Sequence, residues 1–152
     1  MKHYISIIIV TLFAASLIGC GNDGRPADLP RLTSVELTVQ YEDGSPIPDA
    51  LVMLYPFEGK WYSNGQTNSS GSVKPLVDGK YAGVVPGDYK VTVKKQNTVF
   101  PAGYDPNSEK EQPEPTITNL VDTKYAVPAS SPLKLTVGSS SVSETVKVKK
   151  PK

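Results

Sequence analysis

The residue types that carry covalent or metal chemistry are scarce in this chain of 152 residues, and they lie near its start. The chain contains one cysteine, Cys20, and one histidine, His3. A single cysteine excludes an internal disulfide framework and a zinc site built from several cysteines. Because 16 basic residues balance 15 acidic ones, the composition also argues against a nucleic-acid-binding protein, which normally shows a basic excess or patch.

An apolar run before Cys20 indicates export. Residues 4–18 are apolar apart from scattered Ser and Thr, and they follow a short basic start. The run is shorter than the roughly 20 apolar residues that a bilayer-spanning helix needs, and it fits the central region of a secretory signal peptide. Its end, Leu17-Ile18-Gly19-Cys20, resembles the bacterial lipobox.

This resemblance implies cleavage before Cys20, diacylation of its thiol with fatty acids such as palmitate, and often acylation of the new amine. Two or more acyl chains hold a protein firmly at a membrane. The alternative is an ordinary signal peptide followed by a free or buried cysteine. We therefore expect a lipid-anchored protein of the cell envelope. Gly21 stands where Asp would favour retention at the inner membrane, so the outer membrane is favoured.

Cleavage would also remove the only histidine. The predicted mature chain, residues 20–152, has no base for a Ser–His triad and lacks the ligands of a zinc peptidase. We therefore assign no catalytic residue, no metal site and no cofactor. Hydrolysis by a carboxylate pair stays open, because 15 acidic residues remain. We interpret Glu42-Asp43 and Glu109-Lys110-Glu111 as solvated charge in turns and loops.

A possible binding site is an aromatic cluster across one expected hairpin, formed by Tyr55, Phe57, Trp61 and Tyr62. Aromatic rings on a sheet face can stack on sugars or fill a protein-binding groove. Alternatively, Tyr55 and Trp61 belong to the core and Tyr62 packs at an edge. Two or more co-planar exposed rings would favour binding.

Apolar–polar alternation and turn residues predict short strands that position these residues. The expected strands cover residues 34–41, 50–55, 61–67, 73–77, 89–93, 133–137 and 142–148. Pro75 gives the fourth an edge-like character, and Glu144 interrupts the apolar face of the last. No segment has the apolar period of a helix. The pattern predicts an all-β fold, a single antiparallel Greek-key β-sandwich of seven or eight strands.

The expected organisation is a signal peptide at 1–19, the lipidated Cys20 with a flexible tether at 20–33, and the sandwich at 34–152. A long Pro-rich loop at 96–115 interrupts the sandwich. Long structureless connections inside a domain tend to be functional or disordered. We interpret this one as a mobile surface insertion, with a contact surface as the alternative.

Three motifs, DGSPIPDALV at 43–52, GQTNSSGSV at 65–73 and PGDYKVTV at 86–93, occur in this order. Together they resemble the carboxypeptidase regulatory-like or transthyretin-like (prealbumin-like) β-sandwich. Asn68 stands where the family pattern usually has Asp, and both residues stabilise turns. Tyr89 is expected to pack its ring in the core and to bond its hydroxyl near a corner. The resemblance implies a scaffold and no reaction.

These observations lead us to expect a non-enzymatic structural or interaction module of the cell envelope. A surface carbohydrate-binding module is the alternative, and a hydrolase with two facing carboxylates in a concave pocket is a third. The expected partners are the membrane, through the lipid on Cys20, and an envelope protein or glycan; nucleic acid is not expected. The candidate contact surfaces are residues 96–115 and 55–62.

Overall fold

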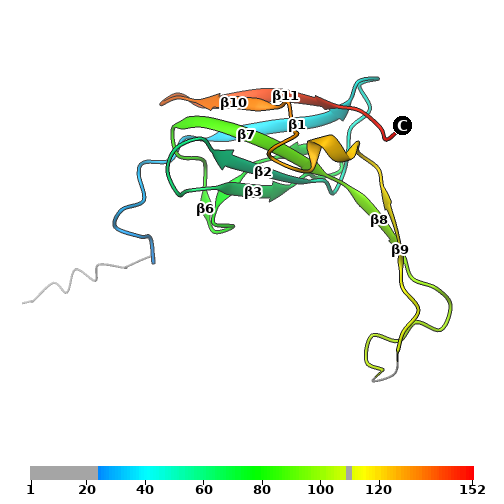
Figure 1. Ribbon diagram of the computed structural model, residues 1–152. Coiled ribbons are helices and arrows are strands. Elements are labelled where there is room, and N and C mark those ends of the chain that lie inside the picture. Colours follow the sequence, from blue (N-terminus) through cyan, green and yellow to red (C-terminus); the bar gives the residue numbers. More distant parts are fainter. Residues whose placement is uncertain (1–23, 109–110) are drawn as a thin grey trace, which may run out of the picture.

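The computed structural model describes residues 24–108 and 111–152, which fold into an all-β sandwich as predicted (Figure 1). Cys20 and the other signal-peptide and lipobox residues lie outside the described part. The first sheet has the order β11-β1-β4 and consists of β1 Val35–Tyr41, β4 Ser72–Val73 and β11 Val142–Val148. The second has the order β10-β7-β2-β3-β5-β6 and consists of β2 Leu51–Pro56, β3 Ser63–Gln66, β5 Leu76–Val77, β6 Tyr81–Ala82, β7 Gly87–Lys94 and β10 Lys134–Val137.

Two smaller elements complete the described chain. A two-stranded sheet pairs β8 Gln96–Val99 with β9 Thr116–Asn119, and a 3-10 helix, η1, covers Thr123–Tyr125. No helix within the described residues is long and apolar enough to span a bilayer.

The core lies between the two larger sheets because every second residue of a strand points to the same side. Leu37 and Val39 of β1 are fully buried, as are Val52 and Leu54 of β2. The inward side chains of β7, β10 and β11 join the same apolar cluster. Burial of these side chains is the main favourable contribution to folding.

Residues of the family-like motifs hold turns and corners, as the resemblance implies. Tyr89 packs its ring in the core and donates a hydrogen bond of 2.6 Å from its hydroxyl to the carbonyl oxygen of Val85. Burial raises the pKa of this hydroxyl. The Thr67 hydroxyl donates to the carbonyl oxygen of Ile47 and accepts from the N–H of Ala50, which fixes the turn before β2 against the turn after β3.

One strand pair differs from the expected antiparallel arrangement. β1 and β11 run parallel, with Val35 opposite Val142 and Tyr41 opposite Val148. Residues 138–141 do not close a hairpin, because they carry the chain from β10 in one sheet to β11 in the other. Because the connection at 138–141 passes from one sheet to the other, β10 and β11 bury valines in the same core from opposite sides.

The position of Glu144 in β11 is explained by the edge of this sheet. Glu144 is opposite the buried Leu37 and lies between Val142 and Val146 in the inward alternation, yet it is exposed. β11 is the outer strand of its sheet. A charge at an inward position of an edge strand obstructs pairing with another chain.

The strand expected at 73–77 is divided at Pro75. β4 pairs with β1, whereas β5 pairs with β3 in the other sheet. Proline has no N–H to donate to a ladder, so Pro75 suits the point where the chain leaves one sheet for the other. Its carbonyl oxygen accepts from the N–H of Gly83.

The folded body begins before the expected boundary at residue 34. We call residues 24–33 the strap. Leu29 is buried, and Thr33 exchanges two backbone hydrogen bonds with Val84. Lys60 donates to Asp28 at 2.5 Å, and this hydrogen bond lowers the pKa of the Asp28 carboxyl. The described part of the expected flexible tether therefore lies against the sandwich.

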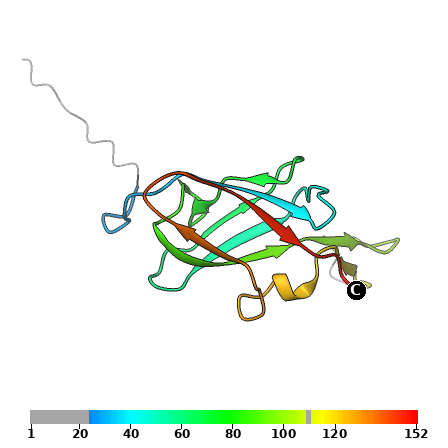
Figure 2. The same ribbon diagram turned by 90° about the horizontal axis from the view of Figure 1, so that it is seen from above.

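The segment 96–115, expected to be a structureless loop, begins with one strand and is followed by another. β8 and β9 pair from Gln96 opposite Asn119 to Val99 opposite Thr116. We call the described residues of segment 96–119 the arm. It projects from the sandwich at the end opposite to residue 24 in both views (Figures 1 and 2).

Two glycines in turns provide a test of this fold. Gly71 has φ +78°, and a Cβ there would overlap the carbonyl oxygen of Val39; Gly44 has φ +85° and open space around it. We expect Gly44→Ala to lower the free energy of unfolding by about 1 kcal/mol through backbone strain alone. Gly71→Ala should cost about 3 kcal/mol, since the collision adds to the strain.

Urea denaturation of the two variants measures these costs. Equal losses for Gly44→Ala and Gly71→Ala would contradict the close approach of the 68–72 turn to β1.

Candidate functional site

None of the four aromatic residues singled out in the sequence belongs to the buried core. Phe57 and Tyr62 are 56% and 41% exposed, and Tyr55 and Trp61 are half-buried. The Lys60 ammonium lies 4.7 Å from the centre of the Trp61 ring and covers it. The assignment of Tyr55 and Trp61 to the core is therefore wrong, and the two exposed rings are Phe57 and Tyr62.

Tyr55 and Phe57 continue a row of apolar side chains on the outer side of the six-stranded sheet. In β2, Val52 and Leu54 enter the core, so Leu51, Met53 and Tyr55 point the other way. Phe57 extends this alternation and donates its N–H to the carbonyl oxygen of Asp88. We call Leu51, Met53, Tyr55 and Phe57 the outward row. Figure 1 shows no further layer of described chain on this side.

The outward row is unusual because β2 is an interior strand of its sheet. Leu51 remains 43% exposed, and among the described residues the Tyr55 hydroxyl finds a partner only in the sulfur of Met53, at 3.2 Å. An antiparallel sheet with one solvated face normally alternates apolar and polar residues. The outward row breaks that alternation, which marks this face as a candidate binding surface.

Three lysines lie beside the outward row, and we call them the lysine strip. Lys90 and Lys94 alternate with the core valines of β7, and Lys134 of β10 is directly opposite Lys90. On the other side, Lys90 is opposite Tyr55 and Lys94 is opposite Leu51. None of the ion pairs found within residues 24–108 and 111–152 includes these lysines. Like charges directly opposite each other destabilise a sheet.

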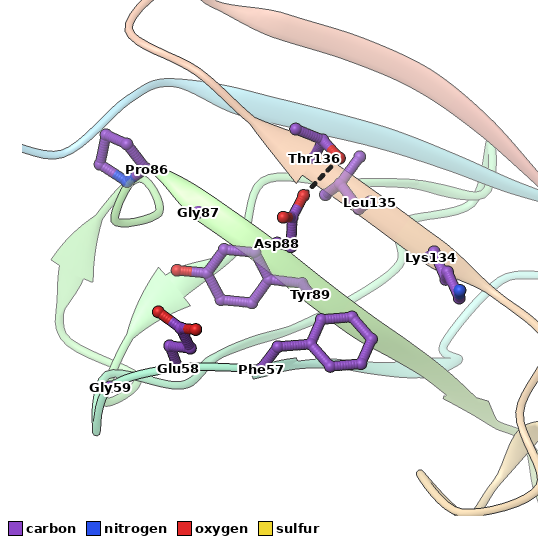
Figure 3. Close-up of a pocket in the computed structure, with 10 residues that line it drawn as sticks. All are labelled: Phe57, Glu58, Gly59, Pro86, Gly87, Asp88, Tyr89, Lys134, Leu135 and Thr136. Carbon is purple, nitrogen blue, oxygen red and sulfur yellow. Dashed lines mark hydrogen bonds between the residues drawn. The ribbon is translucent and has the colours of Figure 1, made fainter.

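A hollow of about 730 Å³ lies where the outward row meets β7 and β10 (Figure 3). Its lining includes Phe57, Glu58, Asp88, Tyr89, Lys134 and Thr136. Asp88 accepts a hydrogen bond of 2.6 Å from the Thr136 hydroxyl. An aromatic ring beside hydroxyl, carboxylate and ammonium groups is suited to binding a polar ligand with apolar faces.

The hollow contains two carboxylates, as a hydrolase would need, but their setting is unsuited to acid–base catalysis. Glu58 and Asp88 are both exposed. Figure 3 shows Asp88 directed toward Thr136 rather than toward Glu58. A carboxyl group acts as a general acid at neutral pH where burial or a close second carboxylate holds its proton. The burial condition is not met at Glu58 or Asp88, because both side chains are exposed.

The pair Glu42 and Asp43 takes part in structural ion pairs at another hollow, of about 320 Å³. Lys149 lies 3.4 Å from Glu42, and Lys150 lies 3.1 Å from Asp43. Hydrogen bonds from the side chain and N–H of Ser45, and then from Lys150, lower the pKa of Asp43 to about 2. These contacts fasten the end of the chain to the turn after β1.

No group of three or more His, Cys, Asp or Glu side chains within the described residues could hold a metal ion. The acidic residues described in the arm, Asp105, Glu111 and Glu114, are exposed. Asp105 accepts from the N–H of Asn107, which is a local turn contact.

The arm carries exposed apolar residues that sequence reasoning overlooked. Val99 and Phe100 are each 54% exposed, and Ile117 is 57% exposed. Phe100 contacts Tyr104, with ring centres 4.5 Å apart. Length and prolines are what mark segment 96–115 in the sequence, whereas the β-branched residues around Val99 and Ile117 are the signal that predicts strands.

The sequence also did not reveal that the lysine strip and the outward row form one surface. The apolar run at 50–55 and the lysines at 90, 94 and 134 are visible in the sequence. Their proximity depends on the pairing of β2 with β7 and of β7 with β10, and alternation within one strand does not reveal which strands pair.

Comparisons with known proteins add little to this geometry. No protein-family profile matches the chain, and no curated protein matches it. Among solved structures it is similar to the major pilin subunit BcpA of Bacillus cereus, with 16% identity and a TM-score of 0.40. The match covers 80% of this chain and 31% of the pilin chain, so this chain spans about a third of that protein's length.

The hydrogen bonds that Asp43 accepts from Ser45, together with its contact with Lys150, predict a change of stability in acid. Because the pKa of Asp43 in the folded state, about 2, lies below its ordinary value of 3.8, its contribution is present above about pH 4 and is lost as the pH falls toward 2. We expect Asp43→Asn to lower the melting temperature at pH 7, and the difference from the unmodified protein should disappear near pH 2.

Thermal melting followed by circular dichroism between pH 7 and pH 2 checks this expectation. Glu114→Gln is the control, since Glu114 is exposed in the arm. A deficit of Asp43→Asn that stays constant down to pH 2 would show that its carboxylate does not stabilise the turn.

Proposed function

We propose that this chain is a non-enzymatic interaction module of the cell envelope, held at the membrane by lipid on Cys20. The observation that carries the proposal is the outward row of Leu51, Met53, Tyr55 and Phe57 on an interior strand. Leaving such side chains in water forgoes the favourable free energy of burying them, about 25 cal/mol per Å². A partner that covers this face would recover it.

The lipid anchor is supported by the Leu17-Ile18-Gly19-Cys20 sequence and by the position of the strap. Three residues separate Cys20 from Gly24, where the described chain begins. Such a connection spans at most about 14 Å when fully extended. In the proposed arrangement the strap end of the sandwich stays near the bilayer and the arm points away from it. Gly21 favours the outer membrane.

Lipidation predicts a specific labelling result in the producing cells. A clickable palmitate analogue should label the unmodified protein and should not label Cys20→Ser, because the thiol is the acceptor. Asp23→Ser is the control, since it changes a neighbouring residue and keeps the thiol. Equal labelling of Cys20→Ser and the unmodified protein, read by in-gel fluorescence, would contradict the anchor.

A surface carbohydrate-binding module is the second candidate. It is favoured by Phe57, whose exposed ring lines the 730 Å³ hollow beside Asp88 and Thr136. Sugar rings stack on exposed aromatic side chains and bond their hydroxyls to carboxylates and hydroxyls. The outer face of the six-stranded sheet thus serves both candidates, which differ in the chemistry of the partner.

Occupation of this face can be measured without knowing the partner. Leu51→Cys places a thiol in the outward row, and Lys147→Cys places one on an exposed position of β11 in the other sheet. We expect maleimide to label Leu51→Cys several-fold more slowly in intact envelopes than in purified protein, with no such difference for Lys147→Cys. The acylated Cys20 does not react.

Equal labelling of Leu51→Cys in envelopes and in purified protein would contradict a covered face, and with it the proposed interaction module.

A further inference from the structure

We propose that the outward row and the lysine strip together bind an acidic polysaccharide, a glycan whose sugar units carry carboxylates. This inference rests on the proposed function and names the ligand class of the same face. It combines two features of this face: the apolar outward row, with the half-buried Tyr55 in β2 and the exposed Phe57 just after it, and the lysines of β7 and β10, which take part in no ion pair of the described residues.

The positive charges of the lysine strip favour binding of an anion. Lys134 and Lys90 are directly opposite each other, and neither is paired with a carboxylate of the described chain. Described lysines elsewhere, such as Lys147 and Lys152, also lack an ion pair, so the strip is distinguished by the direct opposition of Lys90 and Lys134. A bound carboxylate between Lys90 and Lys134 would turn a repulsive pair into two favourable contacts.

The spacing of the strip suits a chain-like ligand. Lys90 and Lys94 are four residues apart in β7, about 13 Å at the rise of a strand. Their partners in β2 are Tyr55 and Leu51, so each lysine stands beside an apolar residue, and Thr92 between them, opposite Met53, is buried. The lysine strip and the outward row run side by side, and at one end of them Phe57 and Thr136 line the hollow. A polymer lying along them would place carboxylates on the lysines and ring faces on the outward row.

The hydrogen-bonding groups of the face favour a glycan over an acidic peptide. A peptide that binds a sheet normally pairs its backbone with a free strand edge. β2 and β7 are interior strands, and both of their edges are paired with neighbours. Sugar hydroxyls need side-chain partners instead, and Asp88 and Asn64 offer them from β7 and β3 on either side of β2.

The acidic groups of the hollow argue against phosphate-rich ligands. Glu58 and Asp88 line the hollow together with Lys134 and would repel any anion placed against them. A nucleic-acid backbone, with a charge on every unit, has more charge to place there than a polysaccharide with spaced carboxylates. The same carboxylates accept hydrogen bonds from sugar hydroxyls. A polysaccharide whose carboxylates are separated by hydroxyl-bearing atoms fits this mixture of signs.

The test is a calorimetric titration. A galacturonic acid hexasaccharide is added to the mature, lipidated protein in detergent, and the heat of binding is measured. We expect saturable binding that weakens as the salt rises from about 0.05 to about 0.5 M, because the contacts are exposed ion pairs. A neutral glucose hexasaccharide should bind at least about tenfold more weakly.

Paired variants assign the binding to this face. Lys90→Gln with Lys134→Gln should weaken binding of the acidic hexasaccharide about tenfold, whereas Lys147→Gln with Lys152→Gln, which removes the same charge from exposed positions elsewhere, should leave it unchanged. The melting temperature of the first pair should stay equal or rise, since the substitutions remove a repulsion. Phe57→Ala should weaken binding of the same probe several-fold.

Several results would overturn the inference. These are no binding of the acidic hexasaccharide, equal loss in both lysine pairs, or equally tight binding of poly-glutamate or of single-stranded DNA. If one of these binding results occurs while maleimide labels Leu51→Cys slowly in envelopes, the acidic glycan is refuted and the interaction module is still supported. Fast labelling would count against the module itself.

Discussion

The two-residue period of the β-strand is the constraint on which this structure depends. Because Val52 and Leu54 must enter the core, Leu51, Met53 and Tyr55 are forced to the opposite side of the sheet. The same rule in β7 sends Val91 and Val93 inward and leaves Lys90 and Lys94 outside. The candidate binding face is thus a direct consequence of the packing that folds the protein. A shift of one residue in either strand would exchange the two faces.

The edges of the sheets show a different physical problem. Strands at an edge expose backbone groups that could pair with another chain. β4 and β6 limit this exposure by being two residues long. β11 is longer, and it carries Glu144 at an inward position and Lys147 outside. The edges formed by β4, β6 and β11 are therefore poor sites for strand addition.

The strap and the arm give the molecule two distinct ends. The strap is fastened by Thr33 to Val84 and by Asp28 to Lys60, so the beginning of the described chain has a fixed position on the sandwich. The arm leaves the opposite end, with Val99, Phe100 and Ile117 exposed. An anchor before the strap would therefore orient the whole body, with the sheet face along its side and the arm at its far end.

The all-β class, the inward residues of most strands and the corner role of Tyr89 follow from the order of the amino acids, because alternation and turn chemistry are local. The same order also defines the lipobox-like segment, whose role stays a prediction. Tertiary structure alone decided the parallel pairing of β1 with β11, the division at Pro75 and the early start of the folded body. It also placed Lys90 between Tyr55 and Lys134. These features depend on which strands become neighbours, and that choice is made by packing between residues far apart in the chain, which no local pattern records.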